Sequence, residues 1–164
     1  MGRNSAAKLQ ALTERLAAPP PEVRTDVALL TVFSRGGLLY GVALSEVVGA
    51  ARLRDLSPIP DALPWMAGVV SHQGEVITLV DLVAFWGLPR RGVADLPTYL
   101  VVTDGVRRVG LLVEGLLGVR EMDGPLRLYE GVASVGVTRE ALFEGAPVAV
   151  LSVDSLLRHA AFQP

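Results

Sequence analysis

Two short runs of aliphatic and β-branched residues lie on either side of Gln73 and Gly74, within residues 67–82. Because glycine adopts a positive φ angle without steric cost, this pattern predicts a β-hairpin whose turn is Gln73-Gly74. The second run leads directly into Asp81, a residue type that favours the N-cap of a helix, and Gly87 ends the apolar stretch that follows. The stretch therefore predicts a hairpin that feeds a short, capped helix near the middle of the chain.

The rest of the chain shows the same pattern of short strands and turns. We expect a hairpin from residues 28–34 and 38–43, another from 99–103 and 106–113, single strands at 115–122 and 148–152, and a closing helix at 153–160. Residues 44–53 fit either a helix or a bulged strand, and residues 61–66 fit one helical turn. Residues 123–145 are rich in turn formers and permit no assignment.

Helices do not alternate with strands along the chain, which argues against a parallel, doubly wound sheet. Glycines recur at the ends of the expected strands, and strongly curved antiparallel sheets are typical of this arrangement. Hairpins in both halves of the chain would suit two small barrels. The sequence therefore predicts a mainly β fold with a few short helices.

The first residues differ from the rest of the chain. Residues 5–17 place three leucines on one face of an amphipathic helix, and three consecutive prolines end that pattern. An isolated helix of this length is marginally stable, so it either docks on another surface or frays. We therefore divide the chain into a helical and proline-rich segment at residues 1–26 and a β domain at residues 27–164.

Composition excludes several classes of function. The net charge of −2 and the pI near 5.7 give no basic footprint for nucleic acid, and the absence of cysteine excludes disulfides and thiol catalysis. Apolar residues make up 51% of the chain, but no apolar run approaches the roughly 20 residues of a membrane helix. No secretion-signal pattern is visible, so we expect a cytoplasmic protein without direct membrane insertion.

No residue pattern indicates catalysis or metal binding. His72, Glu75 and Asp81 match no known spacing of metal ligands. Ser71 and His72 are adjacent on an expected strand, so their side chains point to opposite faces and cannot form a nucleophile–base pair. We expect His72 to be a solvated turn residue, and we expect no enzymatic activity, cofactor or metal.

The apolar surplus must lie in the core or on surface that partners cover. Trp65 and Met66 follow Pro64, and Phe85 and Trp86 lie on the expected short helix. Either pair would be core or partner surface. An apolar excess in a chain without a catalytic or metal-binding pattern indicates a coupling protein that binds two or more partners.

Residues 29–158 resemble the CheW family of chemotaxis coupling proteins. The resemblance rests on the order and spacing of several segments: Tyr40-Gly41-Val42 with Leu44 and Val47, the extended residues 56–60, the hairpin and helix start at residues 68–82, the strand pair at 109–119, and the final strand and helix at 151–157.

The resemblance implies two interlocked five-stranded SH3-like β-barrels that share an apolar interface. Family members lack enzymatic activity and bridge the cytoplasmic tip of a methyl-accepting chemoreceptor to the regulatory domain of a CheA-type histidine kinase. The receptor tip would lie in the groove between the barrels. The residues proposed for this groove and its surroundings are Val42, Leu44, Val47, Val69 and Val70, with Trp65 and Met66 as further partner-surface candidates.

Two positions depart from the family pattern. The family commonly has an arginine where this chain has Gln73, within the signature turn His72-Gln73-Gly74, and an acid where this chain has Gly49. The resemblance implies that this arginine and this acid form an ion pair. Loss of both members leaves no unpaired charge behind. The departures indicate a divergent member.

The function predicted from the sequence is a non-enzymatic adaptor in bacterial chemosensory signalling, recruited to membrane-associated receptor arrays and serving chemotaxis or twitching or gliding motility. The alternative is a small β-barrel that binds a ligand or nucleic acid, which would require a pocket with convergent polar groups or a basic face.

Overall fold

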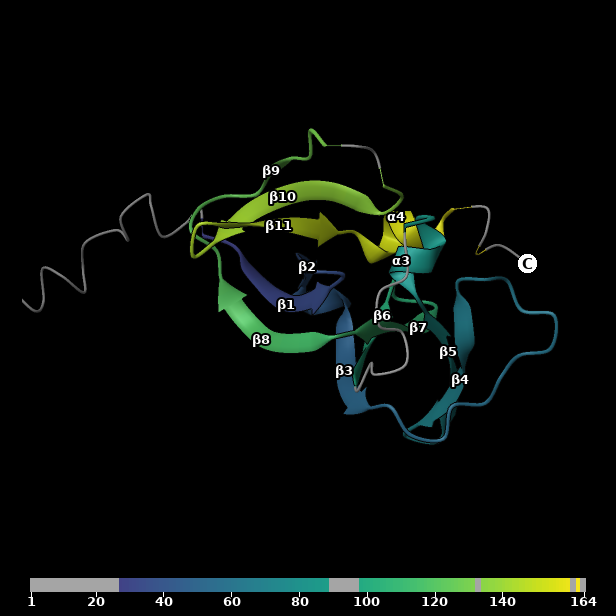
Figure 1. Ribbon diagram of the computed structural model, residues 1–164. Coiled ribbons are helices and arrows are strands. Elements are labelled where there is room, and N and C mark those ends of the chain that lie inside the picture. The colour runs from purple at the N-terminus through teal and green to yellow at the C-terminus, as the bar shows by residue number, and fades with distance from the viewer. Residues whose placement is uncertain (1–26, 89–97, 132–133, 160–161, 163–164) are drawn as a thin grey trace, which may run out of the picture.

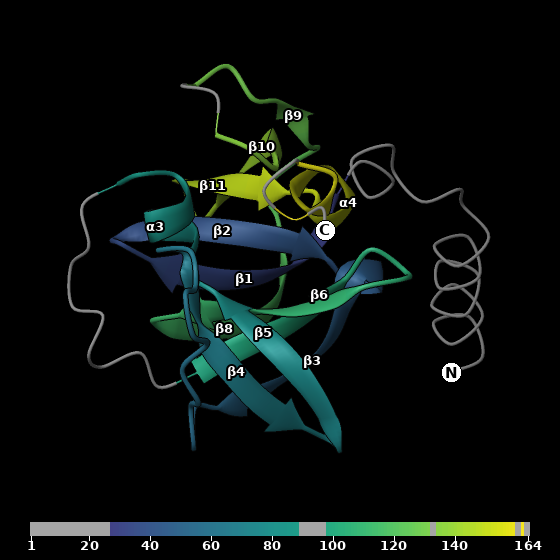
Figure 2. The same ribbon diagram turned by 90° about the vertical axis from the view of Figure 1, so that its right-hand side faces the viewer.

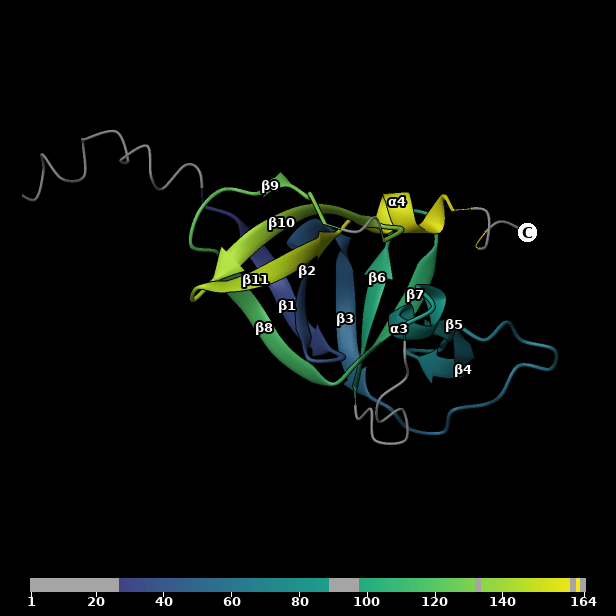
Figure 3. The same cartoon turned by 45° about the horizontal axis from the view of Figure 1, so that its top comes forward.

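The computed structural model describes residues 27–88, 98–131, 134–159 and 162, and the chain forms two β-sheets with a few short helices (Figure 1). The first sheet has the strand order β8-β1-β2-β11-β10-β9 and the second β3-β6-β7-β5-β4. Both sheets curve, and they lie next to each other (Figures 1 and 3). The mainly β fold and the two-sheet plan are as predicted.

The first sheet combines the first strands of the domain with the last. Its strands are β1 (Leu29–Arg35), β2 (Leu38–Ala43), β8 (Gly115–Glu121), β9 (Arg127–Leu128), β10 (Val137–Phe143) and β11 (Ala146–Leu151). β1, β2, β8 and β11 lie where strands were expected, whereas β10 falls in the unassigned stretch 123–145, and β9 is only two residues long. Neighbouring strands are antiparallel except for β2 and β11, which are parallel.

The second sheet uses the central part of the chain. Its strands are β3 (Val47–Arg52), β4 (Met66–His72), β5 (Glu75–Val80), β6 (Thr98–Thr103) and β7 (Arg108–Val113). Here too one pair is parallel, β5 with β7. The segment between β3 and β4 extends away from the sheet as a long loop (Figures 1 and 3), and Ser57 in this loop forms a single β-bridge with Val69.

The two sheets are built on one plan and exchange an edge strand. In each, a central hairpin (β1-β2 or β6-β7) is paired in parallel with the second strand of another hairpin (β10-β11 or β4-β5). The strand that follows each central hairpin crosses to the other sheet: β3 follows β2 but pairs with β6, and β8 follows β7 but pairs with β1. This exchange is what interlocks the two sheets.

The equivalent hairpins match residue by residue at their turns. Gln73 and Gly74 have φ angles of 49° and 80°, and Glu144 and Gly145 have φ angles of 48° and 78°. Two consecutive positive φ angles define a type I′ turn, whose twist fits that of the strands on either side. His72 ends β4 and Phe143 ends β10, so these two residues hold equivalent positions.

Each of these hairpins leads into a short capped helix. The Asp81 side chain caps α3 (Leu82–Phe85) by accepting from the backbone N–H groups of Val83 and Ala84. The Ser152 side chain caps α4 (Val153–Leu157) by accepting from the N–H of Ser155. The predicted hairpin, N-cap and helix at residues 67–85 are thus confirmed.

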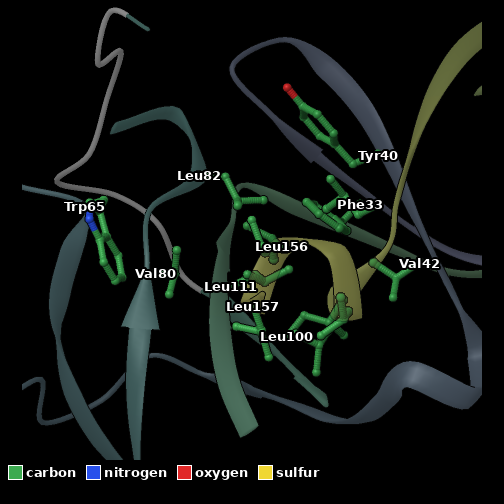
Figure 4. Packing of buried hydrophobic residues seen from close by; sticks show 14 residues of the cluster. Phe33, Tyr40, Val42, Trp65, Val80, Leu82, Leu100, Leu111, Leu156 and Leu157 are labelled. Carbon is green, nitrogen blue, oxygen red and sulfur yellow. The ribbon is translucent and has the colours of Figure 1, made fainter. Parts of the chain in front are cut away.

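A cluster of buried apolar residues joins the two sheets (Figure 4). Phe33, Tyr40 and Val42 come from the first sheet, Val80, Leu100 and Leu111 from the second, and Leu82, Leu156 and Leu157 from the helices. In Figure 2, α3 lies at the left and α4 at the right above the second sheet, with β2 running between them, and buried leucines of both helices belong to the cluster. Each sheet also has a smaller core of its own.

Several local predictions are confirmed and others are wrong. Residues 44–53 contain a three-residue 3₁₀ helix, η1 (Leu44–Glu46), and then β3 with the expected bulge between Val47 and Gly49. Residues 61–66 form turns instead of a helical turn, because Asp61 has a φ angle of 53°, which is outside the right-handed helical region. The closing helix ends at Leu157, short of the expected 160, and the expected helix at 5–17 lies outside the described residues.

Candidate partner-binding surfaces

A buried ionic cluster lies where the two sheets meet. Arg35 is fully buried; its Nη1 lies 2.7 Å from Glu114 Oε1 and its Nη2 lies 3.1 Å from Asp81 Oδ1. Glu114 Oε1 also accepts from the Gly36 N–H at 2.9 Å. We call Arg35, Asp81 and Glu114 the junction cluster, since it joins the first hairpin to the start of α3 and to the β7–β8 connection.

The sequence did not reveal this cluster. Arg35 was expected in a turn beside two glycines, where arginines are usually solvated, whereas it is the last residue of β1 and has no exposed surface. An arginine next to a hairpin glycine pair gives no local sign of burial, because its acidic partners are 46 and 79 residues away.

Three side chains, those of Glu114, Tyr40 and Glu46, have shifted pKa values. The Gly36 N–H and the Arg35 guanidinium hold the pKa of Glu114 below its ordinary value, in that order of effect. Burial is the main cause that raises the pKa of Tyr40, which stacks on Phe33 nearby. Glu46 in η1 shows the opposite shift to Glu114: burial raises its pKa, although it accepts from the Val153 N–H.

The signature turn is placed as predicted, but the prediction for His72 is wrong. Gln73 and Gly74 are exposed at the tip of the β4–β5 hairpin, whereas His72 is only 9% exposed. The His72 ring lies edge-on to Tyr99, and Nδ1 shares a 3.1 Å hydrogen bond with the Tyr99 hydroxyl. His72 is buried because its side chain points toward β3, the opposite edge of the curved sheet, where it faces Gly49.

An open pocket of about 800 Å³ lies between these two edges. Its lining comes mainly from β3, from β4 and from the loop between them, together with Gln73, Val76 and Tyr99. We call this opening the β3–β4 seam. In the strand order, β3 and β4 are the outer strands of the second sheet, so the seam is where this sheet does not close on itself by strand pairing.

The five groove candidates do not form one surface. Val42 is fully buried and Val70 is 3% exposed, so they are core residues and cannot contact a partner without a rearrangement. Val47 is half-buried and packs on the cluster between the sheets, while Val69 lines the β3–β4 seam. Leu44 is the candidate most accessible to a partner, with 41% of its surface exposed.

Trp65 and Met66 also differ from each other. Trp65 is 8% exposed and packs against Phe85 and Phe162, so it belongs to the core. Met66 is half-buried and lines a second open pocket, of about 660 Å³, together with the exposed leucines Leu56, Leu63 and Leu88. Only Met66 of this pair therefore contributes to accessible apolar surface.

Neither a metal site nor a membrane-spanning helix is found among the described residues. Within the part of the chain that the structure describes, no group of three or more histidine, aspartate or glutamate side chains could hold a metal ion. None of the described helices is long and apolar enough to cross a membrane.

Comparison with known proteins identifies relatives of this chain. The family model of the CheW-like domain matches residues 29–161. Protein FrzA of Myxococcus xanthus is 28% identical over 90 residues, which cover 55% of this chain and 56% of FrzA, so the match spans little more than half of that relative. The crystal structure of the scaffolding protein TtCheW from Thermoanaerobacter tengcongensis is similar with a TM-score of 0.71 at 18% identity, over 83% of this chain and 95% of that one. This last likeness shows a shared fold.

Proposed function

Because the chain belongs to the CheW-like domain family, we propose that it is a non-enzymatic adaptor that couples a chemoreceptor to a CheA-type histidine kinase. The observation that carries this proposal is the family match over residues 29–161, which covers both sheets. The adaptor would bind the regulatory domain of the kinase and the cytoplasmic tip of a methyl-accepting receptor. It would act at membrane-associated receptor arrays, in chemotaxis or in twitching or gliding motility.

The exposed apolar residues support an adaptor with more than one binding face. Leu44 and Val48 are 41% and 38% exposed and lie at the crossover from the first sheet to the second. Met66 lines a separate pocket with exposed leucines. Exposed apolar side chains grouped in this way are typical of surfaces that a partner covers. We assign the Leu44 surface to the receptor tip and propose that Met66 and its pocket contact the kinase.

The test is binding of the full chain to each partner separately. Leu44→Glu places a charge on the proposed receptor surface, and it should weaken binding of the receptor tip by about 100-fold or more because the charge would be desolvated in the complex. Binding of the kinase regulatory domain should be unchanged. Val47→Asp is a poorer test, since Val47 packs on the core and the substitution would also destabilise the fold.

Leu128→Glu is the matched control, because Leu128 is 68% exposed on β9 and is no candidate for either contact. If folded Leu44→Glu binds the receptor tip as tightly as the Leu128→Glu control, the assignment of this surface is wrong. If the unsubstituted chain binds neither partner, the proposed coupling function is wrong as well.

A further inference from the structure

The His72 side chain at the β3–β4 seam has one ring nitrogen that forms no hydrogen bond within the described part of the chain. Nδ1 is held by the Tyr99 hydroxyl at 3.1 Å, but buried Nε2 has no hydrogen-bond partner among the residues that the structure describes. Buried polar atoms in folded proteins are nearly always hydrogen-bonded, and an unpaired one destabilises the fold. When the Tyr99 hydroxyl donates to Nδ1, the ring proton lies on Nε2, which then needs an acceptor.

The residue opposite His72 supplies no acceptor. A Cβ atom at Gly49 would lie 3.6 Å from His72 Nε2, an ordinary van der Waals distance, and it would meet no other residue within 4 Å. Gly49 does not have the positive φ angle that favours glycine. Neither backbone strain nor lack of room therefore requires glycine here, and its effect is to leave space beside Nε2.

The other sheet shows that the fold does not require a polar residue at this point. Phe143 holds the position equivalent to His72, and it packs within the apolar core of the first sheet. Gly118 holds the position equivalent to Gly49, since both follow the bulge of the exchanged strand. Gly118 has a φ angle of 81°, so glycine is needed there for the backbone. A histidine facing a glycine that the backbone does not require is thus found in the second sheet and not at the equivalent positions of the first.

The charges around the seam favour an anion. Arg52 and Arg54 line the pocket with a single acidic residue, Asp55. Neither arginine forms an ion pair with any other residue that the structure describes. Since the chain as a whole carries a net charge of −2, this local excess of positive charge is not a general property of its surface.

We propose that the β3–β4 seam binds an aspartate or glutamate side chain of a protein partner, whose carboxylate accepts a hydrogen bond from His72 Nε2 and pairs with Arg52 or Arg54. A partner side chain fits this site better than a free small molecule does, because the pocket is open to solvent along the seam and small ligands are mostly enclosed. Because Nε2 is buried, lining side chains must move to admit the carboxylate, and the exposed Gln73 is one of those that line the pocket. The inference rests on the proposed function for one point, namely that the carboxylate belongs to a protein partner.

The test requires neither the kinase nor the receptor, so its outcome is independent of the coupling function. The isotope-labelled full chain is titrated with a peptide of alternating glutamate and glycine, and in parallel with its glutamine–glycine counterpart. The side-chain ring nitrogens of His72 and the backbone amides lining the seam are followed by NMR. We expect the acidic peptide to shift the Nε2 signal at concentrations at least about ten-fold below those that the neutral peptide needs.

Three variants and one salt complete the experiment. His72→Phe copies the residue of the other sheet and should abolish the preference for the acidic peptide while the protein stays folded, as judged by its amide spectrum. Arg54→Gln should weaken binding of the acidic peptide, whereas Arg120→Gln, an exposed arginine of the first sheet, should not. An equal response to both peptides, or an undiminished preference in His72→Phe, would overturn the proposal. So would a shift of Nε2 by sodium acetate at the same carboxylate concentration, which would indicate a site for free anions.

Discussion

The junction cluster and the β3–β4 seam each bury a cationic or potentially cationic side chain, but they do so with opposite results. Arg35 at the junction is fully buried and contacts two carboxylates, those of Asp81 and Glu114. His72 at the seam is almost as buried, yet its only polar contact among the residues that the structure describes is with the neutral Tyr99 hydroxyl.

This difference indicates that the junction cluster is structural, whereas the β3–β4 seam is suited to binding. The junction residues come from three distant parts of the chain and are linked by two ion pairs and by the Gly36 N–H, so they stabilise one arrangement of the two sheets. The seam leaves Nε2 of His72 beside an open pocket. Substitutions in the two regions should therefore affect different properties: folding at the junction and binding at the seam.

The largest effect is expected from Arg35→Met. Methionine retains most of the side-chain volume but leaves the buried Asp81 carboxylate without its cationic partner, a change that typically destabilises proteins by about 3–5 kcal/mol. Urea denaturation monitored by tryptophan fluorescence measures the change in the free energy of unfolding. The control is Arg158→Met, which removes the exposed Arg158–Asp154 pair of α4 and should cost less than about 0.5 kcal/mol. Similar losses in both variants would show that the junction cluster does not stabilise the fold.

Asp81→Ala should have the next largest effect, because Asp81 combines two roles. It caps α3 and pairs with Arg35, so we expect a loss of about 2–4 kcal/mol in the free energy of unfolding. Ser152→Ala provides a matched comparison, since Ser152 caps the equivalent helix α4 through one backbone N–H and has no ionic partner. That variant should lose only about 1 kcal/mol. The comparison isolates the contribution of the ion pair, which would be absent if the two losses were equal.

Local patterns in the sequence were sufficient to predict the elements that depend on neighbouring residues. The turn at Gln73-Gly74, the Asp81 cap and the first hairpin all follow from residue types within a few positions of each other. Strand β10 was missed because it lies in a turn-rich stretch and carries two consecutive charged residues, Arg139 and Glu140.

The burial of polar residues was the other failure, and it has a different cause. Arg35 and His72 are buried against residues distant in the sequence: Glu114, next to the exchanged strand β8, for the first, and Gly49 of the exchanged strand β3 with Tyr99 of β6 for the second. The shared plan of the two sheets was equally hidden, because equivalent positions carry unrelated residues, as in His72 and Phe143. The groove candidates Val42 and Val70 were assigned by resemblance, and their burial depends on packing that no local pattern reveals.

Gly49→Asp should place a carboxylate of the chain itself in the β3–β4 seam, where we propose that a partner carboxylate binds. The new carboxylate would lie on the side of β3 that faces His72 Nε2 and could accept its hydrogen bond. Relative to Gly49→Asn, which has the same shape without the charge, we expect stability to rise by about 1 kcal/mol at neutral pH. Thermal unfolding of the two variants measures this difference. Equal stability would mean that His72 Nε2 does not interact with an acid at this position.

The smallest effect is expected at Glu114, the exposed member of the junction cluster, whose side chain is 35% exposed. Its pKa in the folded protein is held below the ordinary value of 4.5 by the Gly36 N–H and by Arg35. Because the folded pKa is below the unfolded one, Glu114 stabilises the protein above about pH 4.5, and this contribution is lost as the pH falls through the folded pKa.

Glu114→Gln should therefore be less stable than the unsubstituted chain at neutral pH, by at most about 1 kcal/mol given the exposure of the side chain, and the difference should shrink as the pH is lowered past 4.5. Urea denaturation across this pH range measures it. Glu46, whose pKa is raised by burial, contributes a pH dependence of the opposite sign in both proteins, so it cancels in the comparison. A difference that stayed constant down to the lowest pH would assign the effect of Glu114 to packing, and only Asp81 would then act as an ionic partner of Arg35.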